Sequence, residues 1–170
     1  MRDAPAGVPS TPAGLPGPLA EDLLRLDLQL CFSLNSASRA IGGVYRGVLK
    51  DLGLTYPQYL VMLVLWEHGP LPVKQIGTLL RLDSGTLSPL IKRLEAAGYV
   101  RRERSTQDER SVTVHPTEAG TALRDQAEGV PPQILASTGL TPGEITELQT
   151  LLNRVTAHID PADATGNCTD

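Results

Sequence analysis

A run of short polar and basic side chains at helical spacing could contact DNA bases. Ser84, Ser88 and Lys92 are four residues apart, and Thr86 and Arg93 lie beside them. A helix places residues four apart on one face, and here that face has little bulk. Such a helix can enter a major groove, where Ser and Thr contact base edges and Lys or Arg contact phosphates or guanine. The segment is therefore a candidate DNA-recognition helix.

The segments around this face predict a winged helix-turn-helix. A shorter apolar helix at about 73–81 precedes it across a turn at Leu82-Asp83, the compact spacing of a helix-turn-helix. Two strands, 99–104 and 110–114, follow and are joined by a polar tip at 105–109. The face opposite the polar one has the apolar spacing of a buried helix stripe: Leu87, Leu90, Ile91 and Leu94. An ordinary amphipathic helix packed on a surface hairpin is the alternative.

The sequence is compatible with two different first residues of the recognition helix. Asp83 and Ser84 are good N-caps. Pro89 removes a backbone donor, which is harmless only within the first turn of a helix. Either the helix begins near Thr86, or it begins at Asp83 and is distorted.

Charge is distributed unevenly along the chain. The whole sequence has 15 Lys plus Arg against 19 Asp plus Glu, a formal charge of -4. The segment from Lys92 to Arg104 has five basic residues and two acidic ones, a balance of +3 that leaves -7 for the remainder. A local basic patch on an acidic body suits a specific duplex binder. Arg104, at the end of this patch, is a further candidate for DNA contact.

Apolar stripes at both ends of the chain predict a helical dimerisation module. A helix is expected over about 19–52 and others over 117–160, where Thr141-Pro142-Gly143-Glu144 is a strong start signal. A winged domain cannot cover such long stripes alone, so a second subunit should. The segment 57–67 is apolar all round and should be core.

We therefore expect a mainly α fold with a small β-hairpin wing. Residues 1–18, with five prolines and three glycines, should be a disordered arm. Residues 19–160 should form one domain, with the winged helix-turn-helix at about 55–116. Residues 161–170 should be a flexible tail.

Composition excludes several classes of protein. No apolar run reaches about 18 residues and no signal-peptide core is present, so we expect a cytoplasmic protein without a membrane partner. Cys31 and Cys168 should then be reduced. The three histidines are scattered, so neither a metal nor another cofactor is expected. Cys31 by itself would be a small buried hydrophobe without chemistry.

Residues 82–120 resemble the MarR family of winged-helix bacterial regulators. The matching run is DSGTLSPLIKRLEAAGYVRRERSTQDERSVTVHPTEAG, with Asp108-x-Arg110 at the wing and Thr117-x-x-Gly120 after it. Asp108 can hold Arg110 at the hairpin tip, and an arginine there fits a narrow minor groove. The resemblance implies a dimeric repressor that binds a double-stranded operator.

Two further segments are similar to the organic hydroperoxide sensors (OhrR-like) within that family. They are DLQLCF at 27–32 and LTYPQYL at 54–60. The resemblance implies a homodimer that leaves its operator when organic hydroperoxide oxidises Cys31. It also implies that Tyr45 and Tyr56 hydrogen-bond this cysteine.

Two departures from that pattern affect the mechanism. Asn35 stands where some relatives have a further tyrosine, so the rearrangement after oxidation can differ. Cys168 lies in the tail and not in the later helix that holds a second cysteine in some relatives. This favours a one-cysteine mechanism, in which a small thiol caps the sulfenic acid or the sulfur is over-oxidised.

The position of Cys31 in the expected helix suggests how it is activated. About twelve residues separate it from the expected helix start, which is too far for the helix dipole to act. Tyrosine hydroxyls would then have to stabilise the thiolate.

The spacing of Cys31 and Tyr45 predicts a shared site. Fourteen residues on one helix correspond to about 21 Å, which a tyrosine cannot span unless the helix folds back at Gly42-Gly43. Two such helices packed antiparallel about a two-fold axis would bring Tyr45 of one subunit to Cys31 of the other. Tyr56 would come from the same partner as Tyr45.

Three functions are compatible with these features of the sequence. The first is a peroxide-responsive DNA-binding repressor. The second is a regulator of the same fold that is released by a small aromatic ligand. The third is a thiol peroxidase, but the chain lacks the Cys-x-x-Cys pattern that thiol exchange favours, so we expect a regulator rather than an enzyme.

Overall fold

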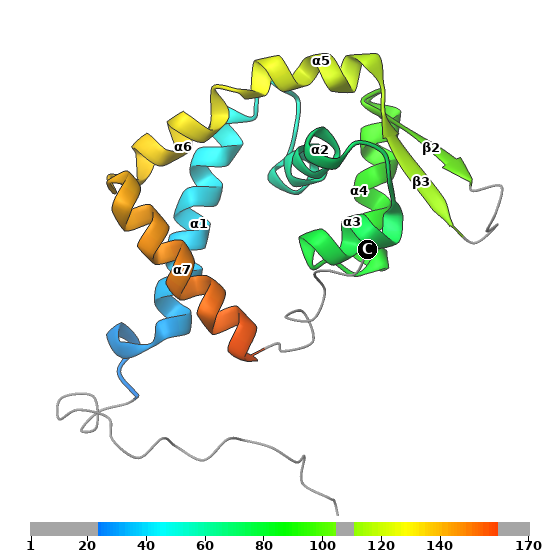
Figure 1. Cartoon of the computed structure of the whole chain (residues 1–170). Helices are drawn as coiled ribbons and strands as arrows, with labels where there is room; N and C mark the ends of the chain where they lie inside the picture. The colour runs from blue at the N-terminus through cyan, green and yellow to red at the C-terminus, as the bar shows by residue number, and fades with distance from the viewer. Residues whose placement is uncertain (1–23, 105–110, 160–170) are drawn as a thin grey trace, which may run out of the picture. The chain divides into compact units, whose positions relative to one another are not determined.

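The computed structural model describes residues 24–104 and 111–159 (Figure 1). The expected arm at 1–18, the expected wing tip at 105–109 and the expected tail at 161–170 with Cys168 lie outside the described residues. The chain divides into two compact units, 1–40 and 41–170, each of which is described by itself. Among the described helices, none combines the length and the apolarity needed to cross a bilayer.

The first unit contains the beginning of the long helix α1, which spans Leu30–Val48. We expected this helix from about residue 19, and that start is wrong. Gln29 has an extended backbone and separates α1 from a short 3-10 helix, η2, at Leu26–Leu28. The far end was also placed too late, because a turn that ends at Gly53 (φ 65°) follows Val48. The helical backbone runs through Gly42-Gly43 without a break.

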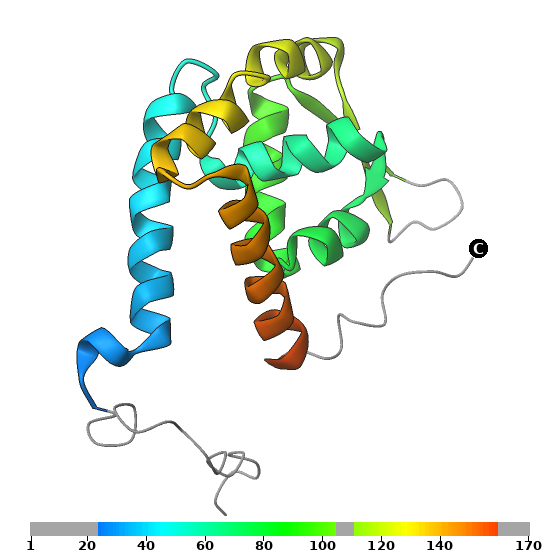
Figure 2. The same cartoon turned by 60° about the vertical axis from the view of Figure 1, so that its left-hand side comes forward.

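The second unit contains a winged helix-turn-helix, which confirms the expected fold class. The core helix α2 (Tyr56–His68) lies against α3 (Val73–Leu80) and α4 (Ser84–Ala96) (Figures 1 and 2). After the wing come α5 (Glu118–Ala127), α6 (Val130–Thr138) and α7 (Pro142–Ile159). α5 ends at Ala127, and both Pro131 and Pro132 sit in the first turn of α6, where their missing N–H groups cost nothing.

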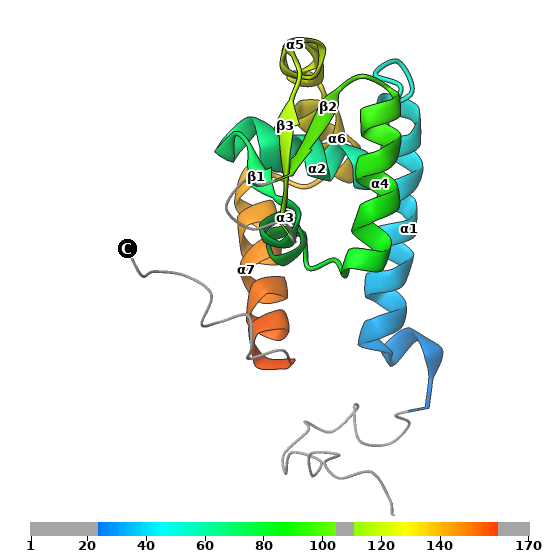
Figure 3. The same ribbon diagram turned by 90° about the vertical axis from the view of Figure 1, so that its right-hand side faces the viewer.

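The sheet has three antiparallel strands in the order β1-β3-β2 (Figure 3). The expected hairpin corresponds to β2 (Val100–Arg104) and β3 (Val112–Pro116), so the second strand lies about two residues later than predicted. β1 (Leu71–Pro72) was not predicted. It pairs with β3 through Leu71 and Val114. Two residues are too few to show the alternation by which a strand is recognised.

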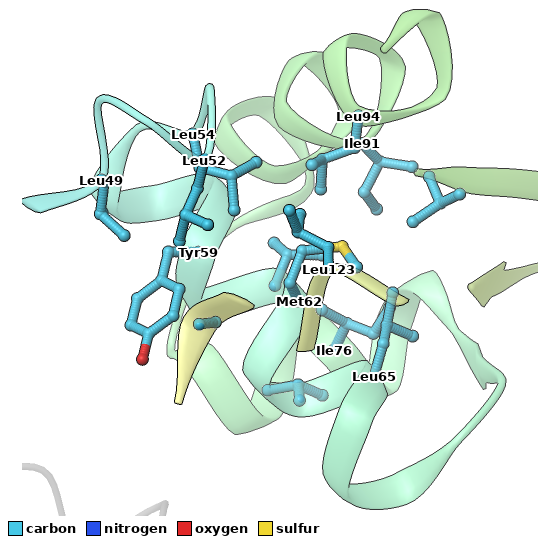
Figure 4. Close-up of a cluster of buried hydrophobic side chains, with 14 of the residues drawn as sticks. Leu49, Leu52, Leu54, Tyr59, Met62, Leu65, Ile76, Ile91, Leu94 and Leu123 are labelled. Carbon is cyan, nitrogen blue, oxygen red and sulfur yellow. The ribbon is translucent and has the colours of Figure 1, made fainter. Parts of the chain in front are cut away.

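The core of the second unit forms around α2 (Figure 4). As expected, this helix is buried on several sides, and Met62 and Val61 are fully buried. Side chains from the turn after α1 and from α3, α4, β3 and α5 pack around it: Leu49, Ile76, Leu87, Ile91, Leu94, Val114 and Leu123. Truncating one such leucine to alanine typically costs about 2–5 kcal/mol. This core fixes α4 and the sheet relative to α2.

The N-terminus of α5 is bonded to the base of the wing. The hydroxyl of Thr117 donates to the carbonyl of Gly98 at 2.7 Å and accepts from the N–H of Gly120 at 3.0 Å. The Thr117 N–H donates to the carbonyl of Tyr99 at 3.0 Å. A Cβ at Gly120 would collide with that same Tyr99 carbonyl, so only glycine fits. These contacts explain the Thr117-x-x-Gly120 pattern.

Neither α1 nor α7, both fully described, buries a residue. Large apolar side chains on α7 are exposed: Leu148, Leu151, Val155 and Ile159. Leu30, Phe32 and Ile41 of α1 are exposed as well. These are the stripes for which the sequence predicts a second subunit.

Candidate nucleic-acid interface and thiol site

The recognition helix α4 begins at Ser84, with Asp83 as its N-cap. One carboxylate oxygen of Asp83 accepts from the N–H of Thr86 at 2.8 Å, and the other accepts from its hydroxyl at 2.8 Å. These bonds hold the pKa of Asp83 below its usual range. The helix therefore begins at the earlier of the two expected positions, and Pro89 lies inside it.

The polar face of α4 is exposed as the spacing predicts. Ser84, Ser88, Lys92 and Arg93 are all exposed, while the opposite stripe is buried. Thr86 is exposed too, but its hydroxyl proton is donated to Asp83. Thr86 therefore acts first as a capping partner and presents its oxygen only as an acceptor.

Two of the five basic residues of the patch are engaged in ion pairs. Arg102 of β2 forms a two-point pair with Glu95 of α4, through Nη2 at 2.6 Å and Nε at 2.7 Å to the same carboxylate oxygen, while its backbone N–H reaches the other oxygen at 3.1 Å. Arg101 pairs with Glu103 at 2.6 Å. Each arginine lowers the pKa of its carboxylate partner.

The remaining cations are the ones available to phosphate groups. Within the described part of the chain, Lys92, Arg93 and Arg104 are exposed and have no ion-pair partner. The balance of +3 that the sequence indicates thus lies on these three side chains. Asp108 and Arg110 lie outside the described residues.

A groove of about 420 Å³ lies between α3 and α4 and was missed by the sequence reasoning. Lys74 and Thr78 of α3 line it and are exposed, and Ser84 of α4 lines the other side. The sequence did contain a signal for this polar side of α3, because Lys74 and Thr78 are four residues apart. A Cβ on Gly77 would lie 2.9 Å from the Leu82 carbonyl oxygen, so glycine allows the close approach of α3 to the turn.

Cys31 is the second residue of α1 and is exposed. The expectation that it lies about twelve residues inside its helix is therefore wrong, because Gln29 ends the preceding segment. The backbone N–H groups of a first turn have no partner inside the helix and favour negative charge beside them. The argument that Cys31 lies too far from the helix N-terminus for the helix dipole to act on it therefore no longer applies.

The two predicted sensor tyrosines lie together in the second unit. The ring centroids of Tyr45 and Tyr56 are 4.4 Å apart. Burial raises the pKa of the Tyr45 phenol, and the neighbouring Tyr56 and Tyr59 raise it further. Tyr45 and Cys31 are 14 residues apart on continuous helix, which corresponds to about 21 Å. One helix cannot bring these two side chains into contact.

Tyr59 extends this pair into a row of rings that the sequence reasoning missed. Its centroid lies 6.1 Å from Tyr45 and 6.2 Å from Trp66. Its ring is buried, and burial raises the pKa of its phenol, with a smaller contribution from Tyr56. The spacing of Tyr56, Tyr59 and Trp66 along α2 was the available signal.

The buried α2, the α3–α4 turn with its exposed polar helix face, and the three-stranded wing define a winged helix-turn-helix protein of the transcriptional-regulator class. A family described as transcriptional regulator SarA/Rot matches residues 44–126. The chain belongs to this SarA/Rot and MarR-type family of winged-helix transcriptional regulators.

Two curated relatives cover most of the chain. TtmR, a regulator of Methylorubrum extorquens, is 45% identical over 150 residues, which are 88% of this chain and 75% of TtmR. The organic hydroperoxide resistance transcriptional regulator of Bacillus subtilis is 44% identical over 131 residues, which are 77% of this chain and 89% of that protein.

Solved structures of AbfR from Staphylococcus epidermidis are similar in fold. Overoxidized AbfR bound to DNA matches with a TM-score of 0.67 and 38% identity, over 82% of this chain and 98% of that one. Reduced AbfR bound to DNA matches with a TM-score of 0.67 and 37% identity, over 82% and 97%.

Proposed function

We propose that this chain is a DNA-binding repressor that acts as a homodimer and releases its operator when organic hydroperoxide oxidises Cys31. The observation that carries the proposal is the exposed Cys31 thiol in the first turn of α1. It occurs in a chain that is 44% identical to a regulator of organic hydroperoxide resistance. As a DNA-binding regulator, the protein would act in the cytoplasm.

DNA binding is assigned to α4 and the wing. The exposed Ser84 and Ser88 suit base edges, and Lys92, Arg93 and Arg104 suit phosphates. The resemblance adds Arg110, held by Asp108, as a minor-groove contact. The DNA-bound structures of AbfR, a relative of the same fold, support a duplex partner.

A second copy of the chain is proposed to cover α1 and α7. Both helices expose apolar stripes that are costly in water, at about 25 cal/mol per Å² of apolar area. Antiparallel α1 helices would let Tyr45 and Tyr56 of one chain reach Cys31 of the other. The proximity of Tyr45 to Tyr56 supports their joint use in one site.

The proposed chemistry is a two-electron oxidation of sulfur. The Cys31 thiolate attacks one peroxide oxygen, the O–O bond breaks, and the alkoxide takes a proton and leaves as the alcohol, so that the cysteine becomes a sulfenic acid. A small thiol then attacks this sulfur and water leaves, giving a mixed disulfide. The Tyr45 phenol is protonated at neutral pH even at the ordinary pKa of a tyrosine, and its pKa is raised further by burial, so its hydroxyl can donate to the thiolate.

The form that releases DNA is proposed to be the mixed disulfide. AbfR is described as bound to DNA both reduced and overoxidized, so over-oxidation is compatible with DNA in that relative. A bulky adduct on Cys31 would instead separate α1 from its partner. No role is assigned to Cys168.

The test measures affinity for a duplex selected from a random library by the reduced protein. Cumene hydroperoxide with free cysteine should release the wild type but not Cys31→Ser, and Cys168→Ser should behave as the wild type. Release of Cys31→Ser by an aromatic acid, with no effect of peroxide on the wild type, would favour the ligand-controlled regulator. Catalytic peroxide consumption without any duplex binding would favour the thiol peroxidase.

A further inference from the structure

A row of aromatic rings leads away from the two proposed sensor tyrosines. It runs from Tyr56 to Tyr45 (4.4 Å between centroids), on to Tyr59 (6.1 Å) and on to Trp66 (6.2 Å). All four residues belong to the second unit, and three of them lie on α2. Tyr59, in the middle of the row, is buried, so its ring has little free volume in which to absorb a displacement of its neighbours.

The last ring of the row is bonded to another helix. The indole N–H of Trp66 donates to the carbonyl of Gly120 in the first turn of α5, at 2.8 Å. Trp66 is the only tryptophan of the chain. Among the described residues, its indole provides the polar link between α2 and α5, so a shift of this ring acts directly on the start of α5.

The first turn of α5 packs tightly against the base of the wing. A Cβ on Gly120 would collide with the Tyr99 carbonyl and would also lie 3.3 Å from the terminal methyl carbon of Met62 on α2. Thr117 adds two hydrogen bonds, to the carbonyls of Gly98 and Tyr99. Tyr99 immediately precedes β2, the strand that leads to Arg104. Movement of Gly120 therefore moves the base of the wing.

We propose that Trp66 couples the tyrosine pair to the wing. When oxidation displaces Tyr45 and Tyr56, the displacement reaches β2 through the Trp66–Gly120 hydrogen bond. This inference rests on the proposed function, because it assumes that oxidation of Cys31 displaces those tyrosines. The element with two states is the Trp66 indole, which is hydrogen-bonded to the Gly120 carbonyl in one state and released from it in the other. Oxidation breaks this hydrogen bond and shifts the wing away from its DNA-binding position.

Trp66→Phe tests this coupling because it keeps an aromatic ring beside Tyr59 but removes the indole N–H donor, together with the second ring that carries it. The measured quantity is the ratio of operator dissociation constants in the oxidised and reduced states, with cumene hydroperoxide and free cysteine as oxidant and capping thiol. Because the variant lacks this hydrogen bond in both states, it should bind the selected duplex more weakly than the wild type does when reduced. Its ratio should fall by about threefold or more, the effect of one lost hydrogen bond.

Tyr99→Phe is the matched control. It too removes one hydrogen-bond donor from a half-buried aromatic residue, here the hydroxyl of Tyr99 at the wing base, which reaches the Leu52 carbonyl at 3.5 Å. That bond joins the turn between Tyr45 and Tyr56 directly to the wing base, so it is the competing route. If Trp66 provides the coupling, the ratio of Tyr99→Phe should stay at the wild-type value. An equal loss in both variants would show general loosening and overturn the proposal.

Emission of the single tryptophan gives a second readout that needs no variant at position 66. It should change when the wild type is oxidised, at the rate of duplex release, and stay constant in Cys31→Ser. The proposal is overturned if Trp66→Phe keeps the wild-type ratio, or if wild-type emission stays constant while DNA is released. Absence of release from the wild type would instead refute the proposed redox control itself.

Discussion

The ring centroids of Tyr45 and Tyr56 lie 4.4 Å apart, although Tyr45 stands near the end of α1 and Tyr56 opens α2. The turn that ends at Gly53 folds the chain back and makes this contact possible. Cys31, in contrast, is separated from Tyr45 by 14 residues of helix. The two tyrosines can therefore serve one site together, and we predict that the thiol of this site comes from the other subunit of the proposed dimer.

Heterodimers of Cys31→Ser and Tyr45→Phe chains test this shared site. One site then keeps Cys31 with an intact Tyr45 from the partner, while the other site is damaged twice. The remaining Cys31 should be oxidised by cumene hydroperoxide at the wild-type rate, measured by sulfenic-acid trapping. A rate as slow as that of the Tyr45→Phe homodimer would place both residues in one chain.

Alkaline pH should destabilise the fold through Tyr45 and Tyr59. Both have a raised pKa in the folded state, mainly from burial, so the folded chain keeps protons that the unfolded chain loses near pH 10. Their contribution is present below about pH 10 and is lost as pH rises towards the raised values. Urea unfolding between pH 8 and 11 should show this fall, and Tyr59→Phe should reduce its steepness. A variant with an unchanged slope would contradict the assignment.

Gly120→Ala should lower the free energy of unfolding by about 1–3 kcal/mol, the usual cost of overpacking. The new Cβ would collide with the Tyr99 carbonyl, and backbone cannot move aside as a flexible side chain does. Gly47→Ala is the matched control, since no atom lies within 4 Å of its added Cβ. Alanine inside α1 should raise stability by about 0.5–1 kcal/mol. Urea denaturation of both variants would measure the contrast.

Arg104 and Arg101 should differ in their contribution to DNA binding although both are exposed on β2. Arg101 is paired with Glu103, whereas Arg104 has no ion-pair partner among the described residues. Arg104→Ala should reduce the slope of log affinity against log salt by about 1. Arg101→Ala should change the slope less. Titrations of operator at several salt concentrations measure this, and equal slopes would remove the distinction.

Ser88→Ala should change operator preference, because Ser88 is exposed on the polar face of α4, which we propose enters the major groove. Arg110→Ala should weaken binding to all duplexes and lower the salt slope. Competition between selected and random duplexes separates the two effects. If Ser88→Ala lost specific and random binding equally, a base-contacting role for this hydroxyl would be untenable.

The sequence alone determined the features that depend on neighbours along the chain. The buried stripe of α4 follows from apolar residues at helical spacing, and Asp83 caps it as expected. The start of α7 follows in the same way, since Thr141 and Glu144 exchange cap bonds over three residues. Such signals are local, so periodicity and capping chemistry suffice to find them.

Only the tertiary structure decided the features that depend on distant partners. β1 exists because Leu71 meets Val114, and Arg102 is neutralised because Glu95 of α4 reaches it. The row from Tyr45 through Tyr59 to Trp66 joins two helices, and Gly120 is constrained by Tyr99. The start of α1 also escaped prediction, because apolar spacing continues through η2 while the backbone of Gln29 does not. Long-range packing, which local spacing does not encode, set each of these contacts.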